Sequence, residues 1–310
     1  MRSRIVFTAI IILVLAGVSP GCKPGQKPAP GVQKIKVVTT LFPLYDFAKN
    51  IGGDKVLVSL LLPPGVEPHS FEPKPADIIR INEADIFVYT GKFMEPWAED
   101  VIKGVSNKSL SVVDASKGVK MLPAVSLDRE ESSAALDPHI WLDFDNGKIM
   151  VANIAEALES KDPAGQNFYA QNTQSYDNQL NELDMEFRSS LSDCRSREIV
   201  YAGHYAFGYP AARYGLKYAA AQGVSPDSEP TANDLIALIK QIKKNRINYI
   251  FYEELTSPRI AQTIADETDA KILLLNAAHN VTRDQFEKGV SFIDIMKSDL
   301  ANLKTGLECR

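Results

Sequence analysis

Residues 165–191 read GQNFYAQNTQSYDNQLNELDMEFRSSL, and this segment has no glycine or proline after Gly165. Apolar side chains recur along it at nearly helical spacing, at Phe168, Tyr176, Leu180, Leu183 and Phe187. The pattern predicts a single helix of about seven turns at 3.6 residues per turn. A helix this long in the middle of the chain is interpreted as the connection between two lobes.

On both sides of this segment, short apolar runs alternate with amphipathic segments, which is typical of β-α units and a largely parallel sheet. Before it, the predicted strands are KIKVVTT (34–40), KVLVSLLLP (55–63), DIFVYTG (85–91) and SLSVVDAS (109–116). After it, they are REIVYAGH (197–204), LKYAAAQG (216–223), INYIFYEEL (247–255) and AKILLLN (270–276). A last helix is predicted over FEKGVSFIDIMKSDLANLKTGL (286–307). The predicted fold class is α/β, with two lobes of largely parallel sheet joined by one long helix.

The chain of 310 residues is long enough for two packed cores. Residues 1–21 carry a basic start and an apolar run, as in a secretory signal peptide. Residues 22–34 are rich in Pro, Gly and Lys and predict a flexible tether. We expect an N-terminal lobe over residues 35–162, the linking helix over 163–194 and a C-terminal lobe over 195–310.

The cysteines fit an exported protein. Cys22 follows small residues in SPGC, which resembles the lipobox of bacterial lipoproteins, although Ser19 and Pro20 depart from its preferred residues. We expect cleavage before Cys22 and lipidation of its thiol, because an unlipidated free thiol is unusual in an exported protein. Export also permits a disulfide between Cys194 and Cys309, but two thiols so far apart in sequence do not establish a pairing.

The charge of the chain argues against binding to nucleic acid. Its formal net charge is −5, and the loss of Arg2 and Arg4 with the signal peptide makes it −7. Such a chain lacks the positive charge that attracts phosphate backbones. No second apolar run approaches the length of a membrane-spanning helix. We therefore expect an exported protein that is at most tethered to a membrane.

The chain has only four histidines, and three of them follow predicted strands: His69, His204 and His279. The fourth, His139, lies in the turn LDPHIWLD before a helix. In open α/β sheets, ligands bind beyond the carboxyl ends of the strands, so two facing lobes would bring these side chains together. Imidazole is the commonest metal ligand at neutral pH, and three or four imidazoles suit Zn²⁺, whereas Mn²⁺ prefers carboxylates.

Spacing alone leaves a second interpretation open, in which each histidine only caps or hydrogen-bonds a strand end. The sequence contains neither a His-Glu-x-x-His zinc motif nor a Gly-x-Ser-x-Gly elbow. It also lacks a phosphate-binding glycine loop and a dinucleotide fingerprint.

Six segments in order carry a resemblance to a known family: VVTTLFPLYDFAKNIGGDKV, LLPPGVEPHSFEPKPADI, ADIFVYTG, DPHIWLD, GHYAFGYPAARYGL and SEPTANDL. The chain resembles the zinc- and manganese-type solute-binding lipoproteins of bacterial ABC metal transporters, the family of the periplasmic zinc-uptake protein. The resemblance covers nearly all of the chain after the signal peptide. It implies two α/β lobes joined by a rigid helix, with a metal in the cleft between them.

The resemblance assigns metal-ligand roles to His69, His139 and His204. Manganese-type members tend to have a carboxylate at the third of these positions, so His204 favours Zn²⁺ over Mn²⁺ as the transported ligand. The implied protein is a periplasmic or cell-surface receptor, expected to be monomeric and not an enzyme. Its implied partners are a membrane permease and the ATPase that powers it.

The fourth ligand departs from the family pattern. Many members have a carboxylate after the last strand, whereas this chain reads LLLNAAHN with Asn276 at the expected aspartate position. A neutral amide is a poor zinc ligand, and we favour His279. The alternatives are Glu253, Glu254, Glu67 or a water molecule.

Neighbouring residues have two interpretations each. Tyr45, Trp141, Tyr205 and Phe207 either form a dry shell around the metal or belong to the core. Asp143 either orients an imidazole, as carboxylates do around metal-bound histidines, or caps a helix.

Three rival functions remain. An exported zinc hydrolase would keep an open metal position for water, with Glu67 or Glu253 as its base. A manganese receptor would share the fold. A surface adhesion role is the third, and no residue requires it. For the zinc receptor, affinity should fall as the pH drops through the range of histidine titration.

Overall fold

The computed structural model describes residues 34–124, 135–224 and 230–310. The predicted signal peptide, the lipidation site Cys22 and all of the tether except Lys34 lie outside these ranges. Among the described residues, no helix combines the length and apolar character needed to cross a bilayer.

The first lobe is built on a four-stranded sheet in the order β2-β1-β3-β4, and every pair in it is parallel. Its third strand is buried throughout, which agrees with its uninterrupted apolar sequence. The strands are β1 (Ile35–Thr39), β2 (Val56–Leu60), β3 (Ile86–Tyr89) and β4 (Ser111–Asp114). The helices are α1 (Phe42–Gly52), α2 (Pro75–Asn82), α3 (Ala98–Gly104) and α4 (Phe144–Lys161), with short 3₁₀ turns at Gly53–Lys55, Ile140–Leu142 and Pro163–Gly165.

The second lobe repeats this topology, with the order β6-β5-β7-β8 and parallel pairs throughout. In each lobe the first strand lies between the second and the third. The strands are β5 (Glu198–Ala202), β6 (Lys217–Ala220), β7 (Tyr249–Glu253) and β8 (Lys271–Leu275). The helices are α6 (Gly208–Tyr214), α7 (Ala232–Asn245), α8 (Arg259–Thr268), α9 (Arg283–Glu287) and α10 (Phe292–Gly306). The predicted fold class, two parallel α/β lobes and a long helix, is confirmed.

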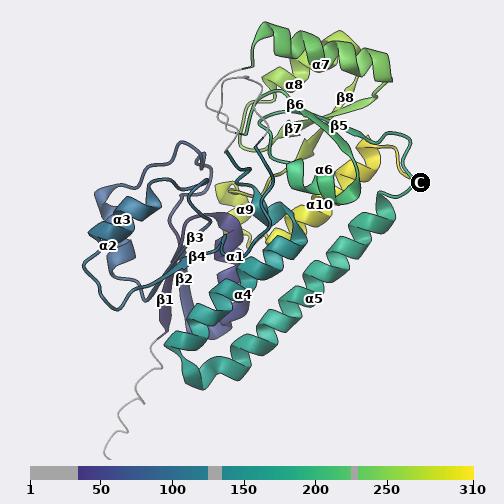
Figure 1. The fold of residues 1–310 in the computed structure, drawn as a ribbon. Coiled ribbons are helices and arrows are strands. Elements are labelled where there is room, and N and C mark those ends of the chain that lie inside the picture. Colours follow the sequence, from purple (N-terminus) through teal and green to yellow (C-terminus); the bar gives the residue numbers. More distant parts are fainter. Residues whose placement is uncertain (1–33, 125–134, 225–229) are drawn as a thin grey trace, which may run out of the picture. The chain divides into compact units, whose positions relative to one another are not determined.

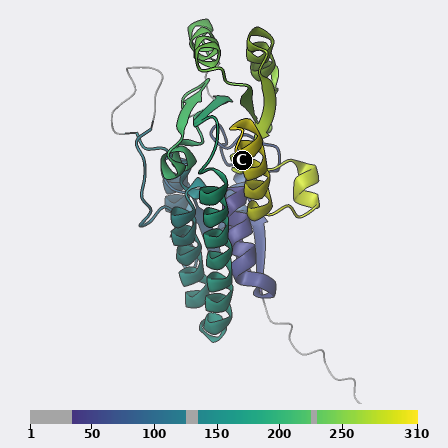
Figure 2. The same cartoon turned by 90° about the vertical axis from the view of Figure 1, so that its right-hand side faces the viewer.

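The long helix is α5 (Gln166–Ser190), which has 25 residues. It lies antiparallel beside α4 and also packs on α1 and α10 (Figures 1 and 2). Its buried stripe is Tyr169, Tyr176, Leu180, Leu183 and Phe187. The stripe predicted from the sequence began at Phe168, which is only partly buried. Tyr169 is the first residue of the buried stripe instead. Its ring is fully buried, and its hydroxyl donates to Asp162 Oδ2, at 3.0 Å.

The predicted last helix is divided into α9 and α10. Gly289 interrupts it with a φ of +70°, a left-handed conformation that ends helices. A new helix then begins at Ser291, whose hydroxyl accepts the backbone N–H of Asp294 while the Asp294 carboxylate accepts the N–H of Ser291.

The two lobes share one hydrophobic core rather than each having a separate one. This core contains Phe42 and Val88 of the first lobe, Tyr201 and Phe251 of the second, and the inner face of α5. Two smaller clusters lie within single lobes, one around Phe87 and one around Ile250. The shared core fixes the position of the loops between the facing sheet edges.

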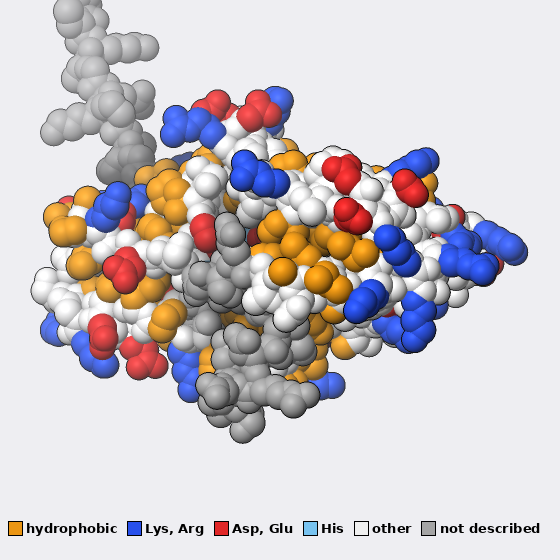
Figure 3. Space-filling model, turned by 90° about the horizontal axis from the view of Figure 1, so that it is seen from above, with side chains coloured by type: hydrophobic (Ala, Val, Ile, Leu, Met, Phe, Trp, Pro, Cys, Tyr) orange, Lys and Arg blue, Asp and Glu red, His pale blue; other side chains and the backbone are white. Residues whose placement is uncertain are grey.

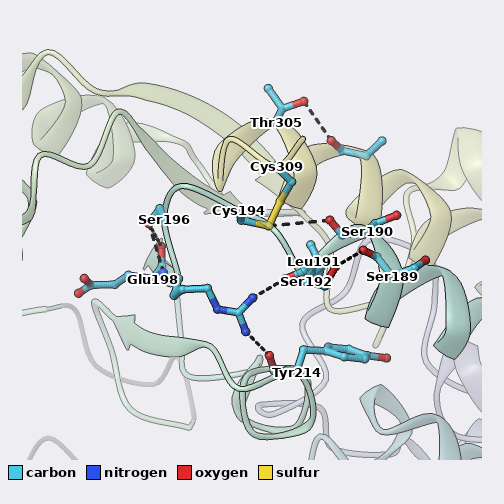
Figure 4. The surroundings of a disulfide bond; sticks show 12 residues. Ser189, Ser190, Leu191, Ser192, Cys194, Ser196, Glu198, Tyr214, Thr305 and Cys309 are labelled. Carbon is cyan, nitrogen blue, oxygen red and sulfur yellow. Dashed lines mark hydrogen bonds between the residues drawn. A yellow bond between two sulfur atoms is a disulfide. The ribbon is translucent and has the colours of Figure 1, made fainter.

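A disulfide joins Cys194 to Cys309 across 115 residues of sequence. It ties the segment after α5 to the end of α10 (Figure 4). Backbone hydrogen bonds flank it on both sides, from the N–H of Ser196 to the carbonyl of Leu307 and from the N–H of Arg310 to that of Asp193, both at 3.0 Å. The pairing that the sequence left open is therefore formed in the structure.

Candidate metal centre

The four histidines of the chain lie together at the facing edges of the two sheets. His69 is in the loop after β2, His139 directly precedes the 3₁₀ turn before α4, His204 follows β5 and His279 follows β8. The centroids of the six ring pairs are all between 5.0 and 6.3 Å apart. Each lobe thus contributes two imidazoles to one cluster.

This spacing fits a single tetrahedral ion. Zn²⁺ binds imidazole nitrogen at about 2.0–2.1 Å, and four rings around one ion then have centroids about 5 Å apart. The Nε2 atom of His69 and both ring nitrogens of His279 are buried without a hydrogen-bond partner. Buried polar atoms normally have a partner, so these nitrogens point to a bound cation.

The cluster is largely closed to solvent. His139, His204 and His279 have no exposed surface, and His69 is partly buried. On the face drawn in Figure 3, no histidine surface is visible among the described residues, and acidic and basic side chains are interspersed. An ion at the cluster would therefore be largely removed from water.

Two of the imidazoles are oriented by buried carboxylates. His139 Nδ1 lies 2.7 Å from Asp137 Oδ1, and His204 Nδ1 lies 2.6 Å from Glu253 Oε1. The backbone N–H of each histidine donates to the same carboxylate, at 3.0 and 3.1 Å. A carboxylate on Nδ1 fixes the tautomer with Nδ1–H and leaves Nε2 as the free donor to a metal.

Gly203 makes the second of these pairs possible. A Cβ atom at this position would lie 2.4 Å from Glu253 Oε2, so any other residue would displace the carboxylate. The glycine before His204 is therefore required for the close approach of β7 to the end of β5.

The two oriented imidazoles face each other, with 3.0 Å between His139 Nε2 and His204 Nε2. If both Nδ1 atoms carry hydrogen, two lone pairs meet at this distance. A cation between them, either a proton or a metal, removes this repulsion. The pair is thus arranged for a bound positive charge.

Burial controls the ionisation of the site. Burial lowers the pKa of His69, His139 and His279 well below the usual range, and their mutual repulsion when protonated adds to this. Burial raises the pKa of Asp137 to about 7 and that of Glu254 well above its usual range. His69, His139 and His279 are therefore available as neutral ligands near neutral pH.

The structure also places the alternative fourth ligands. Asn276 uses its side-chain oxygen to accept the N–H of Ala278, at 2.7 Å. Glu254 Oε1 lies 3.3 Å from His279 Nδ1. Glu67, Glu253 and His279 could form a second metal-binding group.

The carboxylates of that second group already have partners. Glu253 binds His204, as described above, and Glu67 Oε1 accepts the backbone N–H of His69, at 3.1 Å. The group formed by His69, His204 and His279 has unpartnered nitrogens instead. This difference favours the imidazoles.

The aromatic residues expected near the site form a shell around the histidines only in part. Trp141 packs against His139 and His279 and donates its indole N–H to the carbonyl of Ala277, at 2.8 Å. The rings of Tyr45, Tyr205 and Phe207 instead pack at an angle against other aromatic side chains.

The suggestion that Asp143 orients an imidazole is wrong. Its carboxylate caps α4 and accepts from Arg213, at 3.1 Å. Asp137 has the orienting role and was missed, although the Asp-Pro-His motif places it two residues before His139.

Comparison with known proteins identifies the family. A family model described as "Zinc-uptake complex component A periplasmic" matches residues 37–306. The chain belongs to this family. The resemblance seen in the sequence motifs is confirmed.

Relatives in the zinc-uptake family have similar sequences. The chain is 36% identical to the high-affinity zinc uptake system protein ZnuA of Bacillus subtilis, over 96% of this chain and 95% of the relative. It is 33% identical to the zinc-binding lipoprotein AdcA of Streptococcus pneumoniae, over 90% of this chain. It spans only 56% of the length of AdcA.

Two solved structures of similar sequence agree in fold. The Zn(II)-bound ZnuA-like domain of Streptococcus pneumoniae AdcA superimposes with a TM-score of 0.77 at 33% identity, covering 89% of this chain and all of the domain. The metal-dependent lipoprotein YcdH of Bacillus subtilis gives the same TM-score at 38% identity, covering 88% of this chain and 99% of that structure.

Proposed function

We propose that the protein is an extracytoplasmic receptor that captures Zn²⁺ and delivers it to the permease of an ABC transporter. The observation that carries the proposal is the cluster of four imidazoles, two from each lobe, with unpartnered nitrogens. Membership of the zinc-uptake family and the names of its relatives support the zinc assignment. Zn²⁺ is the cargo, and His69, His139, His204 and His279 are its proposed ligands.

The chemistry of the cluster favours zinc over manganese. Manganese sites are rich in carboxylate and water oxygen, whereas imidazole nitrogen suits zinc. Here the carboxylates Asp137 and Glu253 face the Nδ1 atoms and supply negative charge from the outside. Four neutral ligands would leave the charge of the ion uncompensated, and these buried carboxylates offset it.

The same geometry argues against a hydrolase. A zinc hydrolase needs an open position for water and a path for its substrate. Three of the four imidazoles have no exposed surface, and Glu253, a candidate base, is held on His204. A closed site of four protein ligands suits a receptor that holds an ion and does not activate water.

Capture and release follow from the division of ligands between lobes. A Zn²⁺ ion exchanges its water for the imidazoles, and all four can bind only when the lobes are together. Separation of the lobes on a permease would remove ligands and release the ion. Lipid on Cys22 would hold the monomeric receptor near that permease after the signal peptide is removed, with residues 22–34 as the tether between the lipid and a lobe over 35–162.

A calorimetric zinc titration of the chain lacking residues 1–22 tests the proposal, with His279→Ala measured beside it. We expect one tight site, weakened about 10-fold or more in the variant, or about 1.4 kcal/mol. Unchanged affinity in His279→Ala would remove this ligand and require an activity screen for hydrolysis. No tight zinc binding would contradict the receptor, and manganese would be titrated next.

A further inference from the structure

The loop of His279 follows the C-terminal sheet but is bound to the N-terminal lobe. Its carbonyls accept from three N–H groups across the interface. Ala277 accepts from Trp141, His279 accepts from the backbone of Phe42 at 3.2 Å, and Val281 accepts from Gly65 at 2.8 Å. Asn280, the residue directly after His279, is also bound to the N-terminal lobe, through its side chain.

Asn280 has no exposed surface, and its amide nitrogen donates to the carbonyls of Pro63 and Val66, both at 2.8 Å. These carbonyls belong to the loop that leads to His69. Its side-chain oxygen accepts the N–H of Val281, also at 2.8 Å. Both hydrogens of the amide and its oxygen are thus used, so the side chain has one defined orientation.

The backbone of this loop is also strained. Ala278 has a φ of +59°, a left-handed conformation that is unfavourable for a residue with a Cβ. Such a conformation persists only when its surroundings determine it. The bonds from the N-terminal lobe, together with the Asn276 side chain, provide these surroundings.

We propose that Asn280 is a positioning residue for zinc binding, which couples the loop of His69 to the loop of His279. The inference rests on the proposed function, because it assumes that both histidines bind the ion. Through Asn280, His279 is held by the lobe that carries His69 and His139. His204 is then the one proposed ligand held wholly by the C-terminal lobe.

The test is Asn280→Ser in the metal-free protein. Serine can still accept the N–H of Val281 but cannot reach the two carbonyls. Asn153→Ser is the matched control, because the Asn153 amide also donates to two carbonyls, those of Ala115 and Lys117 at 3.2 and 2.9 Å. Each variant is titrated with Zn²⁺ against a chelator, and its free energy of unfolding is measured without metal.

The absorption spectrum of bound Co²⁺ reports the coordination of the metal, which a loss of protein stability alone would not change. Its visible absorption is strong in four-coordinate sites and weak in six-coordinate ones. We expect Asn280→Ser to weaken zinc binding about 10-fold or more, as for other groups that orient ligands. Its Co²⁺ spectrum should move toward that of His279→Ala, while Asn153→Ser keeps the wild-type spectrum and affinity.

Wild-type affinity and Co²⁺ spectrum in Asn280→Ser would overturn the inference, whatever its stability. If Asn280→Ser does not fold, Asn280→Asp replaces it, since aspartate has the same size but offers no donor to the carbonyls. Failure of the wild-type protein to bind zinc would contradict the proposed function itself. Tight wild-type binding with an unaffected Asn280 variant would contradict only the role of Asn280.

Discussion

The two histidine segments of the C-terminal lobe occupy equivalent places but are supported differently. His204 is held by its own lobe: Glu253 of β7 binds its side chain and N–H, and the Tyr218 hydroxyl of β6 donates to its carbonyl, at 3.3 Å. The His279 loop is held largely by the other lobe, through its carbonyls and Asn280. Two ligands that follow parallel strands of one sheet can therefore be held by different lobes. His279 belongs to the C-terminal lobe by sequence but is held largely by the N-terminal lobe.

The largest effect on zinc affinity that would sharpen this comparison is expected from Glu253→Gln. Glutamine keeps only one acceptor oxygen for His204 and removes the negative charge beside its Nδ1, so zinc binding should weaken about 10- to 100-fold. Glu254→Gln is the matched variant and should have less effect, because Glu254 Oε1 lies 3.3 Å from His279 Nδ1 without a hydrogen bond. Competition with a chelator measures both. Equal losses of zinc affinity would show that His204 and His279 depend equally on their neighbouring glutamates, which would contradict the comparison.

A smaller effect is expected from pH. In the metal-free protein, Asp137 holds a proton below its raised pKa of about 7, and a zinc ion on His139 would favour the ionised carboxylate. Binding then releases a proton below pH 7 but not above it. Affinity should rise about tenfold per pH unit up to pH 7 and then level off.

Calorimetry in buffers of different ionisation enthalpy counts the released protons. In Asp137→Asn the slope below pH 7 should disappear. Release of several protons near pH 6.5 would show that the imidazoles titrate in their usual range. That result would support the expectation drawn from the sequence, in which zinc affinity falls as the histidines take up protons.

The smallest effect on zinc affinity is expected from loss of the disulfide. The double variant Cys194→Ser/Cys309→Ser should lose about 2–4 kcal/mol of unfolding free energy. Its zinc affinity should stay within about twofold, because the support of His204 and His279 comes from other elements. Urea denaturation and zinc titration on one preparation separate the two quantities. A large loss of affinity would show that the ends of α5 and α10 help to hold the site.

Periodicity predicted most of the fold. The strands were predicted because strands of parallel sheets are often continuous apolar runs, as in IFVY of β3, which is buried throughout, and KILLL of β8, which is largely only partly buried. The helix α5 was predicted because its apolar stripe continues without glycine or proline. The break at Gly289 was missed, since a single glycine within an amphipathic pattern does not show whether its φ is positive.

The candidate site was less accessible to sequence reasoning. The rule that ligands gather beyond strand ends brought His69, His204 and His279 together, and the Asp-Pro-His motif added His139. The pairing of a carboxylate with a particular imidazole depends on side-chain directions across two strands, as for Glu253 and His204. The attachment of Asn280 to the loop of His69 joins residues more than 200 positions apart, and no local pattern predicts it.

The disulfide also makes the stability of the fold depend on the compartment. It closes a loop of 115 residues that contains almost all of the second lobe, and thiols stay reduced in the cytosol. The crosslink therefore forms only where the chain meets an oxidising environment. In a reducing compartment the polypeptide is easier to keep unfolded, and oxidation stabilises the lobe that supplies half of the imidazoles.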